Sequence, residues 1–145
     1  MDKALASPVG GLFVVMMRIL LVDDNQAMLA DLHEELASDG FTIAGTAHDG
    51  EDALQLVASL DPDVLVIDIT MPGLNGFQVA TRLRESHPRT KILFLTIHEE
   101  PEYISAAFTT GAYGYVSKRR LNSDLAHAIR EVFAGRTFLS PSLQK

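Results

Sequence analysis

The chain has 145 residues, no cysteine, 47% hydrophobic residues and a formal charge of −7 at pH 7. The length fits one domain with one core, and the lack of cysteine excludes disulfides, Cys-ligated metal sites and thiol chemistry. With 12 Lys and Arg against 19 Asp and Glu, the overall charge disfavours nucleic-acid binding and suits a divalent cation.

The N-terminal region contains an apolar stretch, residues 12–22, that Arg18 interrupts. This stretch is too short to cross a bilayer. It continues into Asp23 and Asp24 with no small-residue cleavage site, which argues against export. We therefore expect residues 1–16 to form an N-terminal extension or leader, joined to a buried strand that begins the folded domain.

Apolar runs and amphipathic segments alternate along the rest of the chain. Short runs rich in branched residues predict buried strands, and apolar residues at helical spacing predict helices. In chain order we expect strand 19–22, helix 26–38, strand 41–47, helix 50–60, strand 64–67, helix 76–85, strand 92–95, helix 101–111, strand 113–117 and helix 121–134. This alternation predicts an α/β fold, in which helices cover both faces of a five-stranded parallel sheet.

Chemically competent side chains follow four of these strands: Asp23 and Asp24, Asp68, Thr96 and Lys118. The carboxyl ends of parallel strands meet at one edge of the sheet, so we expect these side chains to converge. Two carboxylates about 4 Å apart repel by roughly 4 kcal/mol at an effective dielectric near 20. Lys118 and a bound Mg²⁺ would offset this repulsion. Such a site can receive a phosphoryl group, because a carboxylate can attack phosphorus while positive charge neutralises its oxygens.

Four sequence segments carry a resemblance to a known family: ILLVDD at 19–24, VLVIDITMPGLNG at 64–76, LT at 95–96 and GAYGYVSK at 111–118. Together they resemble the receiver domain of bacterial two-component response regulators, over residues 17–135. The resemblance implies the flavodoxin-like (CheY-like) fold, with strand order 2-1-3-4-5.

The resemblance also implies the roles of individual residues. Asp68 would be the phosphoacceptor, and Thr96 and Lys118 would contact the phosphoryl group. Asp24, Asp68 and the backbone carbonyl of Thr70 would bind Mg²⁺ directly, with Asp23 acting mainly through a metal-bound water. Thr96 and Tyr115 would form the conformational switch.

The resemblance further implies a phosphorylation-dependent signalling switch in the cytoplasm, with a sensor histidine kinase as partner and a homodimer after phosphorylation. Such a domain catalyses only its own phosphorylation and dephosphorylation and is otherwise not an enzyme. Residues 125–135 and 139–141 resemble the NarL/FixJ type. In that type, residues 136–145 would start a linker to a helix-turn-helix domain absent from this chain, which would make the DNA contacts and regulate transcription.

Some positions depart from the family pattern or leave alternatives open. Arg119 follows Lys118 where most receivers have proline, so the family's cis bond cannot form. Ile97 is larger than the usual residue after Thr96, and Thr70 and His98 occupy positions that tune dephosphorylation in the family. The five histidines lack ligand spacing and are predicted to lie on the surface.

Three other functions compete with a signalling switch. An aspartate-nucleophile phosphatase would need a second acid where Thr70 stands. A binding module that keeps only the fold would not need the complete acidic set. A flavin mononucleotide carrier would need a phosphate-binding loop after the first strand, and the sequence has none.

Overall fold

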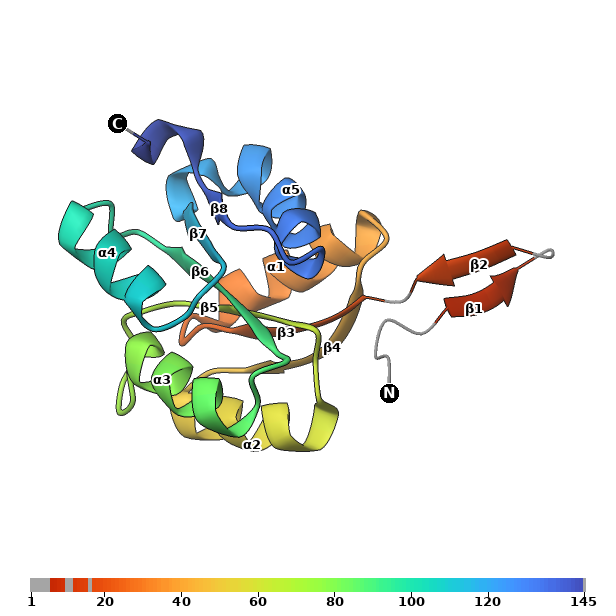
Figure 1. Cartoon of the computed structure of the whole chain (residues 1–145), viewed down its shortest axis with the longest axis horizontal. Helices are drawn as coiled ribbons and strands as arrows, with labels where there is room; N and C mark the ends of the chain where they lie inside the picture. The colour runs from red at the N-terminus through yellow and green to blue at the C-terminus, as the bar shows by residue number, and fades with distance from the viewer. Residues whose placement is uncertain (1–5, 10–11, 16, 145) are drawn as a thin grey trace.

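The computed structural model describes residues 6–9, 12–15 and 17–144. Its main feature is a parallel sheet of order β4-β3-β5-β6-β7-β8, with helices on both faces (Figure 1). The strands of this sheet are β3 (Arg18–Val22), β4 (Thr42–Ala47), β5 (Val64–Ile67), β6 (Lys91–Thr96), β7 (Gly114–Ser117) and β8 (Phe138–Leu139). The first five reproduce the predicted order 2-1-3-4-5, so the predicted α/β, flavodoxin-like fold is confirmed.

The helices alternate with the strands as the apolar spacing predicts. They are α1 (Gln26–Ser38), α2 (Gly50–Leu60), α3 (Gly76–Ser86), α4 (Pro101–Thr109) and α5 (Leu121–Phe133), and a short 3₁₀ helix, η1 (Lys118–Arg120), precedes α5. A second 3₁₀ turn, η2 (Pro141–Leu143), lies near the C-terminus. Each helix boundary lies within two residues of the expected one.

Two apolar layers hold the sheet. On one face α2, α3 and α4 pack around residues such as Leu65, Val79 and Phe94. On the other face α1 and α5 pack around residues such as Leu21 and Ile129. Because both faces are covered, successive strand residues are buried alternately in the two layers, which explains the continuous apolar runs.

Side-chain caps begin three of the helices that follow strands. Asn25 caps α1, Asp49 caps α2 and Asn75 caps α3, each by accepting a hydrogen bond from a backbone N–H of the first turn. At α3 the cap is reciprocal, because the Gln78 side chain accepts from the Asn75 N–H at 2.8 Å. These caps fix where the chain leaves the carboxyl edge of the sheet.

The sixth strand, β8, differs from expectation. It lies in residues 136–145, where the sequence predicts the start of a linker, and it pairs in parallel with β7. The N–H of Phe138 donates to the Tyr113 carbonyl at 2.9 Å, and the N–H of Ser140 donates to the Tyr115 carbonyl at 3.0 Å. A strand of two residues is too short to show a periodic pattern, so the sequence does not reveal it.

The predicted N-terminal extension contains an antiparallel hairpin of β1 (Ala6–Val9) and β2 (Leu12–Val15), which forms a separate sheet and stands away from the domain (Figure 1). The rest of that extension, residues 1–5, 10, 11 and 16, lies outside the described residues. Within the described part of the chain, no helix is long and apolar enough to cross a membrane.

Gly76, the first residue of α3, offers a test of how tightly the fold is built beneath the carboxyl edge. A Cβ at this position would lie 2.3 Å from the backbone oxygen of Asp68 and 3.0 Å from the Cα of Ile69. Backbone cannot yield as a flexible side chain can, so we expect Gly76→Ala to lower the free energy of unfolding by about 2–3 kcal/mol in urea denaturation.

Gly45→Ala is the matched control, because a Cβ there approaches only side-chain methyl groups, the nearest being Leu60 Cδ1 at 2.9 Å. We expect its effect to stay below about 1 kcal/mol. Equal stability losses in the two variants would contradict the close packing of α3 against the Asp68 backbone.

Candidate functional site

The carboxyl edge of the sheet collects the polar side chains that the sequence singles out. Val22 pairs with Ile67, so Asp23 and Asp68 leave neighbouring strands at the same level. Thr96, the last residue of β6, pairs with Ser117, the last residue of β7, and Lys118 follows directly after Ser117. The structure brings Asp23, Asp24, Asp68 and Lys118 together, and Thr96 ends β6 at the same edge of the sheet.

The three acids form a cluster in which one carboxylate oxygen from each lies within 4.8 Å of the others. Asp23 and Asp68 are 2% and 7% exposed, whereas Asp24 is exposed to solvent. An all-oxygen donor set, open on one side, fits a hard divalent cation that keeps several of its waters. Among the described residues, this is the one group of three or more metal-ligating side chains close enough to share an ion.

Lys118 supplies the positive charge for this cluster. Its Nζ lies 2.7 Å from Asp23 Oδ2 and 2.8 Å from Asp68 Oδ2. Burial disfavours the ammonium ion, but the hydrogen bonds and charges of Asp23 and Asp68 outweigh burial and raise the pKa of Lys118 above its ordinary value. Lys118 is therefore charged at neutral pH and bridges two acids that would otherwise repel each other.

Backbone N–H groups fix the remaining oxygen of each bridged carboxylate. Asp68 Oδ1 accepts from the Ile69 N–H at 2.7 Å, and Asp23 Oδ1 accepts from the Asn25 N–H at 2.9 Å. Each carboxylate thus has one oxygen bound to backbone and the other bound to Lys118. Their orientation is set before any ligand arrives.

Thr96 and Tyr115, the predicted switch residues, are both completely buried. The Thr96 hydroxyl accepts from the His98 N–H at 3.3 Å, and the Tyr115 hydroxyl donates to the His98 carbonyl at 2.7 Å. Burial raises the pKa of Tyr115, so its hydroxyl stays protonated as a donor. Ile97, which lies between Thr96 and His98 in the sequence, is 63% exposed.

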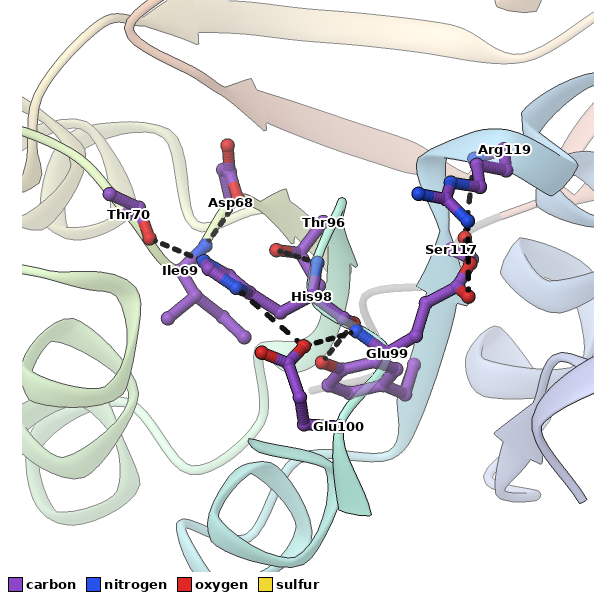
Figure 2. A network of polar contacts seen from close by, with 10 residues as sticks. Asp68, Ile69, Thr70, Thr96, His98, Glu99, Glu100, Ser117 and Arg119 are labelled. Carbon is purple, nitrogen blue, oxygen red and sulfur yellow. Dashed lines mark hydrogen bonds and ion pairs between the residues drawn. The ribbon is translucent and has the colours of Figure 1, made fainter. Parts of the chain in front are cut away.

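Thr70 and His98 contact each other across the site. Thr70 Oγ1 lies 2.8 Å from His98 Nε2 (Figure 2). The His98 ring also stacks on Tyr103, with 4.1 Å between ring centres. His98 is partly exposed, with 21% of its side chain accessible, so it is less solvated than the surface position predicted for the histidines. Histidine spacing alone gives no signal for this contact, although both residues stand two positions after a site residue.

Ser117 and Glu99 are neighbours of Lys118 that sequence reasoning misses. Ser117 Oγ donates to Glu99 Oε2 at 2.5 Å and accepts from the Arg119 N–H at 3.2 Å. Glu99 Oε1 also lies 3.7 Å from a guanidinium nitrogen of Arg119 (Figure 2). With Arg119 in place of the usual proline, the described chain contains no cis peptide bond, and Ser117 instead caps η1, which begins at Lys118.

A flavodoxin-like sheet with three acids, a threonine and a lysine at its carboxyl edge defines a class of phosphoryl-responsive signalling domains. Comparison with known proteins agrees with this class. The response regulator receiver domain matches residues 19–130. The chain is 36% identical over 129 residues to "Response regulator GacA" of Pseudomonas viridiflava, an alignment that covers 88% of this chain and 60% of that protein.

Two solved structures share the fold at similar levels of identity. A LuxR-family two-component response regulator from Aurantimonas sp. SI85-9A1 has a TM-score of 0.82 and 32% identity, covering 88% of this chain and 92% of that one. The receiver domain of the putative response regulator NarL from Mycobacterium tuberculosis has a TM-score of 0.78 and 30% identity, covering 83% of this chain and 98% of that one.

The chain belongs to the receiver-domain family of two-component response regulators, and within it to the NarL/FixJ type. It spans about 60% of the length of the GacA proteins that it matches. Receiver domains bind Mg²⁺ at an acidic pocket, and this structure contains a cluster of three acids, Asp23, Asp24 and Asp68. They are signalling domains and generally not classical enzymes.

Replacing Lys118 tests whether its charge offsets the repulsion between Asp23 and Asp68. Lys118→Met removes the charge and leaves Asp23 and Asp68 facing each other, so we expect the free energy of unfolding in Mg²⁺-free buffer at pH 7 to fall by about 2 kcal/mol. Lys91→Met, which removes a cation stacked on Tyr113, should cost at most about 1 kcal/mol.

The contribution of Lys118 to the free energy of unfolding should depend on pH in one direction. Because the folded state raises the pKa of Lys118, its contribution is fully present below the unfolded value of about 10.4 and is lost only as pH rises through the folded value. The stability difference between wild type and Lys118→Met should thus be constant from about pH 7 to pH 10. If this stability difference is already lost before the pH has risen to about 9, the bridge between Lys118 and the two acids is contradicted.

Proposed function

We propose that this chain is a cytoplasmic, phosphorylation-dependent switch in which Asp68 accepts a phosphoryl group from a sensor histidine kinase in the presence of Mg²⁺. The observation that carries the proposal is the position of Asp68, whose carboxylate lies within the acidic cluster and is hydrogen-bonded to Lys118 at 2.8 Å. Nucleophile and stabilising cation already touch before a donor binds.

The transfer step follows from these contacts. An oxygen of the Asp68 carboxylate forms a bond to phosphorus, and the bond from phosphorus to the donor histidine nitrogen breaks, with the bonding electrons leaving on that nitrogen. The Lys118 ammonium, already at the carboxylate, moves its hydrogen bond to a phosphoryl oxygen. Bound at Asp23, Asp24, Asp68 and the Thr70 backbone carbonyl, Mg²⁺ would neutralise phosphoryl charge.

The backbone of His98 connects the two switch residues. The Thr96 hydroxyl is bound to the His98 N–H and the Tyr115 hydroxyl is bound to the His98 carbonyl. If Thr96 turns toward a phosphoryl oxygen, its bond to His98 breaks and the loop that holds Tyr115 is released. Shifting the ratio of active to inactive conformation from 1:99 to 99:1 requires about 5.5 kcal/mol of differential stabilisation. New charge-assisted hydrogen bonds to the phosphoryl group can supply it.

The partners belong to the same proposal. In our reading residues 17–135 are the receiver domain, and residues 136–145 begin the connection to a helix-turn-helix domain outside this chain. Relatives are described as transcriptional regulators, which supports DNA binding through such a domain. Phosphorylation would promote a homodimer, and the two copies would contact each other either through helices α1 and α5 or through the face between α4 and α5.

Acetyl phosphate provides the test. Incubated with Mg²⁺, the wild-type chain should gain the mass of one phosphoryl group, and it should gain none when a chelator removes Mg²⁺. Asp68→Asn should remain unmodified, because an amide cannot form the acyl phosphate. Intact-mass spectrometry reads both outcomes.

Substitutions of two further acids distinguish a role in Mg²⁺ binding from an effect of overall charge. Asp24→Ala should raise the Mg²⁺ concentration needed for half-maximal modification by about ten-fold or more. Asp31→Ala removes an exposed acid of α1 that lies outside the cluster and should leave that concentration unchanged. Modification of Asp68→Asn at the wild-type rate would refute the proposed function.

A further inference from the structure

The backbone on both sides of Lys118 is held by serine hydroxyls. The Ser117 N–H donates to Ser140 Oγ at 3.3 Å, and the Arg119 N–H donates to Ser117 Oγ at 3.2 Å. Ser117 and Ser140 are both completely buried. The residue that bridges Asp23 and Asp68 therefore lies between two peptide groups whose hydrogen bonds depend on two serines.

Ser140 comes from far along the chain. It belongs to residues 138–144, which we call the C-terminal segment. This segment is held at the edge of β7 by the N–H groups of Phe138 and Ser140, and internally by a bond from Gln144 Nε2 to the Leu139 carbonyl at 2.7 Å. Phe138 packs with the α1 and α5 layer, and Leu139 packs with the opposite layer. The segment thus closes the edge of both layers.

Glu99 extends the network to the loop after Thr96. Its Oε2 accepts a hydrogen bond from the Ser117 hydroxyl at 2.5 Å, and the same Ser117 oxygen accepts from the Arg119 N–H (Figure 2). The orientation of the Ser117 hydroxyl is therefore fixed by a charge-assisted bond. Three separate parts of the chain, the loop after β6, the end of β7 and the C-terminal segment, meet beside Lys118.

We propose that Ser140, acting with Ser117 and Glu99, positions Lys118 for phosphoryl transfer, so that docking of the C-terminal segment is coupled to the state of Asp68. The inference rests on the proposed function, because it deepens the role of Lys118. None of the three residues touches the Asp68 carboxylate, so they are positioning residues. Because coupling between two sites is reciprocal, a phosphoryl group at Asp68 must in turn change how firmly the segment is held.

A kinetic comparison of two serine variants tests the positioning role. Ser140→Ala removes the acceptor of the Ser117 N–H, and Ser142→Ala makes the same change at an exposed position of the same segment. We expect Ser140→Ala to lower the maximal rate of phosphorylation by acetyl phosphate about five-fold to ten-fold, with little change in the half-saturating concentration or in Mg²⁺ affinity. Ser142→Ala should match wild type.

A merely structural role for Ser140 would lower thermal stability without this selective loss of maximal rate. A rate for Ser140→Ala within about two-fold of wild type, or an equal loss in Ser142→Ala, would overturn the positioning role.

Amide hydrogen exchange of the unmodified chain tests the coupling without any substitution. Beryllofluoride with Mg²⁺ mimics the phosphoryl group. We expect it to change the exchange rates of the Phe138 and Ser140 N–H groups about five-fold or more. If the Ile69 amide beside Asp68 responds to beryllofluoride but Phe138 and Ser140 do not, the coupling is refuted while the proposed function stands. If no amide responds, the proposed function fails and this inference fails with it.

Discussion

The Lys118 ammonium between Asp23 and Asp68 is the interaction on which the rest of the site depends. Two carboxylates that are 3% and 9% exposed at their side chains would not share this edge without a cation, and Lys118 lies within 2.8 Å of both. The lysine does not remove the negative charge of the cluster, because Asp24 remains as a third acid. The site is held together and is still short of positive charge, which suits it to a metal ion.

The register in which the parallel strands pair produces this arrangement. The parallel pairing of Val22 with Ile67, and of Thr96 with Ser117, fixes the levels at which the functional residues leave the sheet. A shift of one residue would move every side chain of a strand to the opposite face of the sheet, where it would no longer fit its packed neighbours. Close packing of α3 at Gly76 against the Asp68 backbone oxygen holds the loop after β5 in place. The strands and the tightly packed loop thus preorganise the site.

The sequence predicts the parts of the site that follow from strand ends. Asp23, Asp68 and Lys118 come directly after apolar runs, and one geometric rule brings them together. It does not predict the contact of Thr70 with His98, the bond of Ser117 to Glu99, or the bond of Ser117 to Ser140. No periodicity or motif encodes such contacts. They arise from side-chain positions that exist only once the layers have packed.

Chemical trapping of the phosphorylated residue tests the central claim most directly. Borohydride reduces an acyl phosphate of aspartate to homoserine, a change that peptide mass spectrometry locates in the sequence. After incubation with acetyl phosphate and Mg²⁺, the account predicts homoserine at position 68, and none at positions 23 or 24 although both acids lie in the same cluster. Homoserine at position 23 or 24, or its absence from all three positions in a chain that has gained a phosphoryl group, would contradict it.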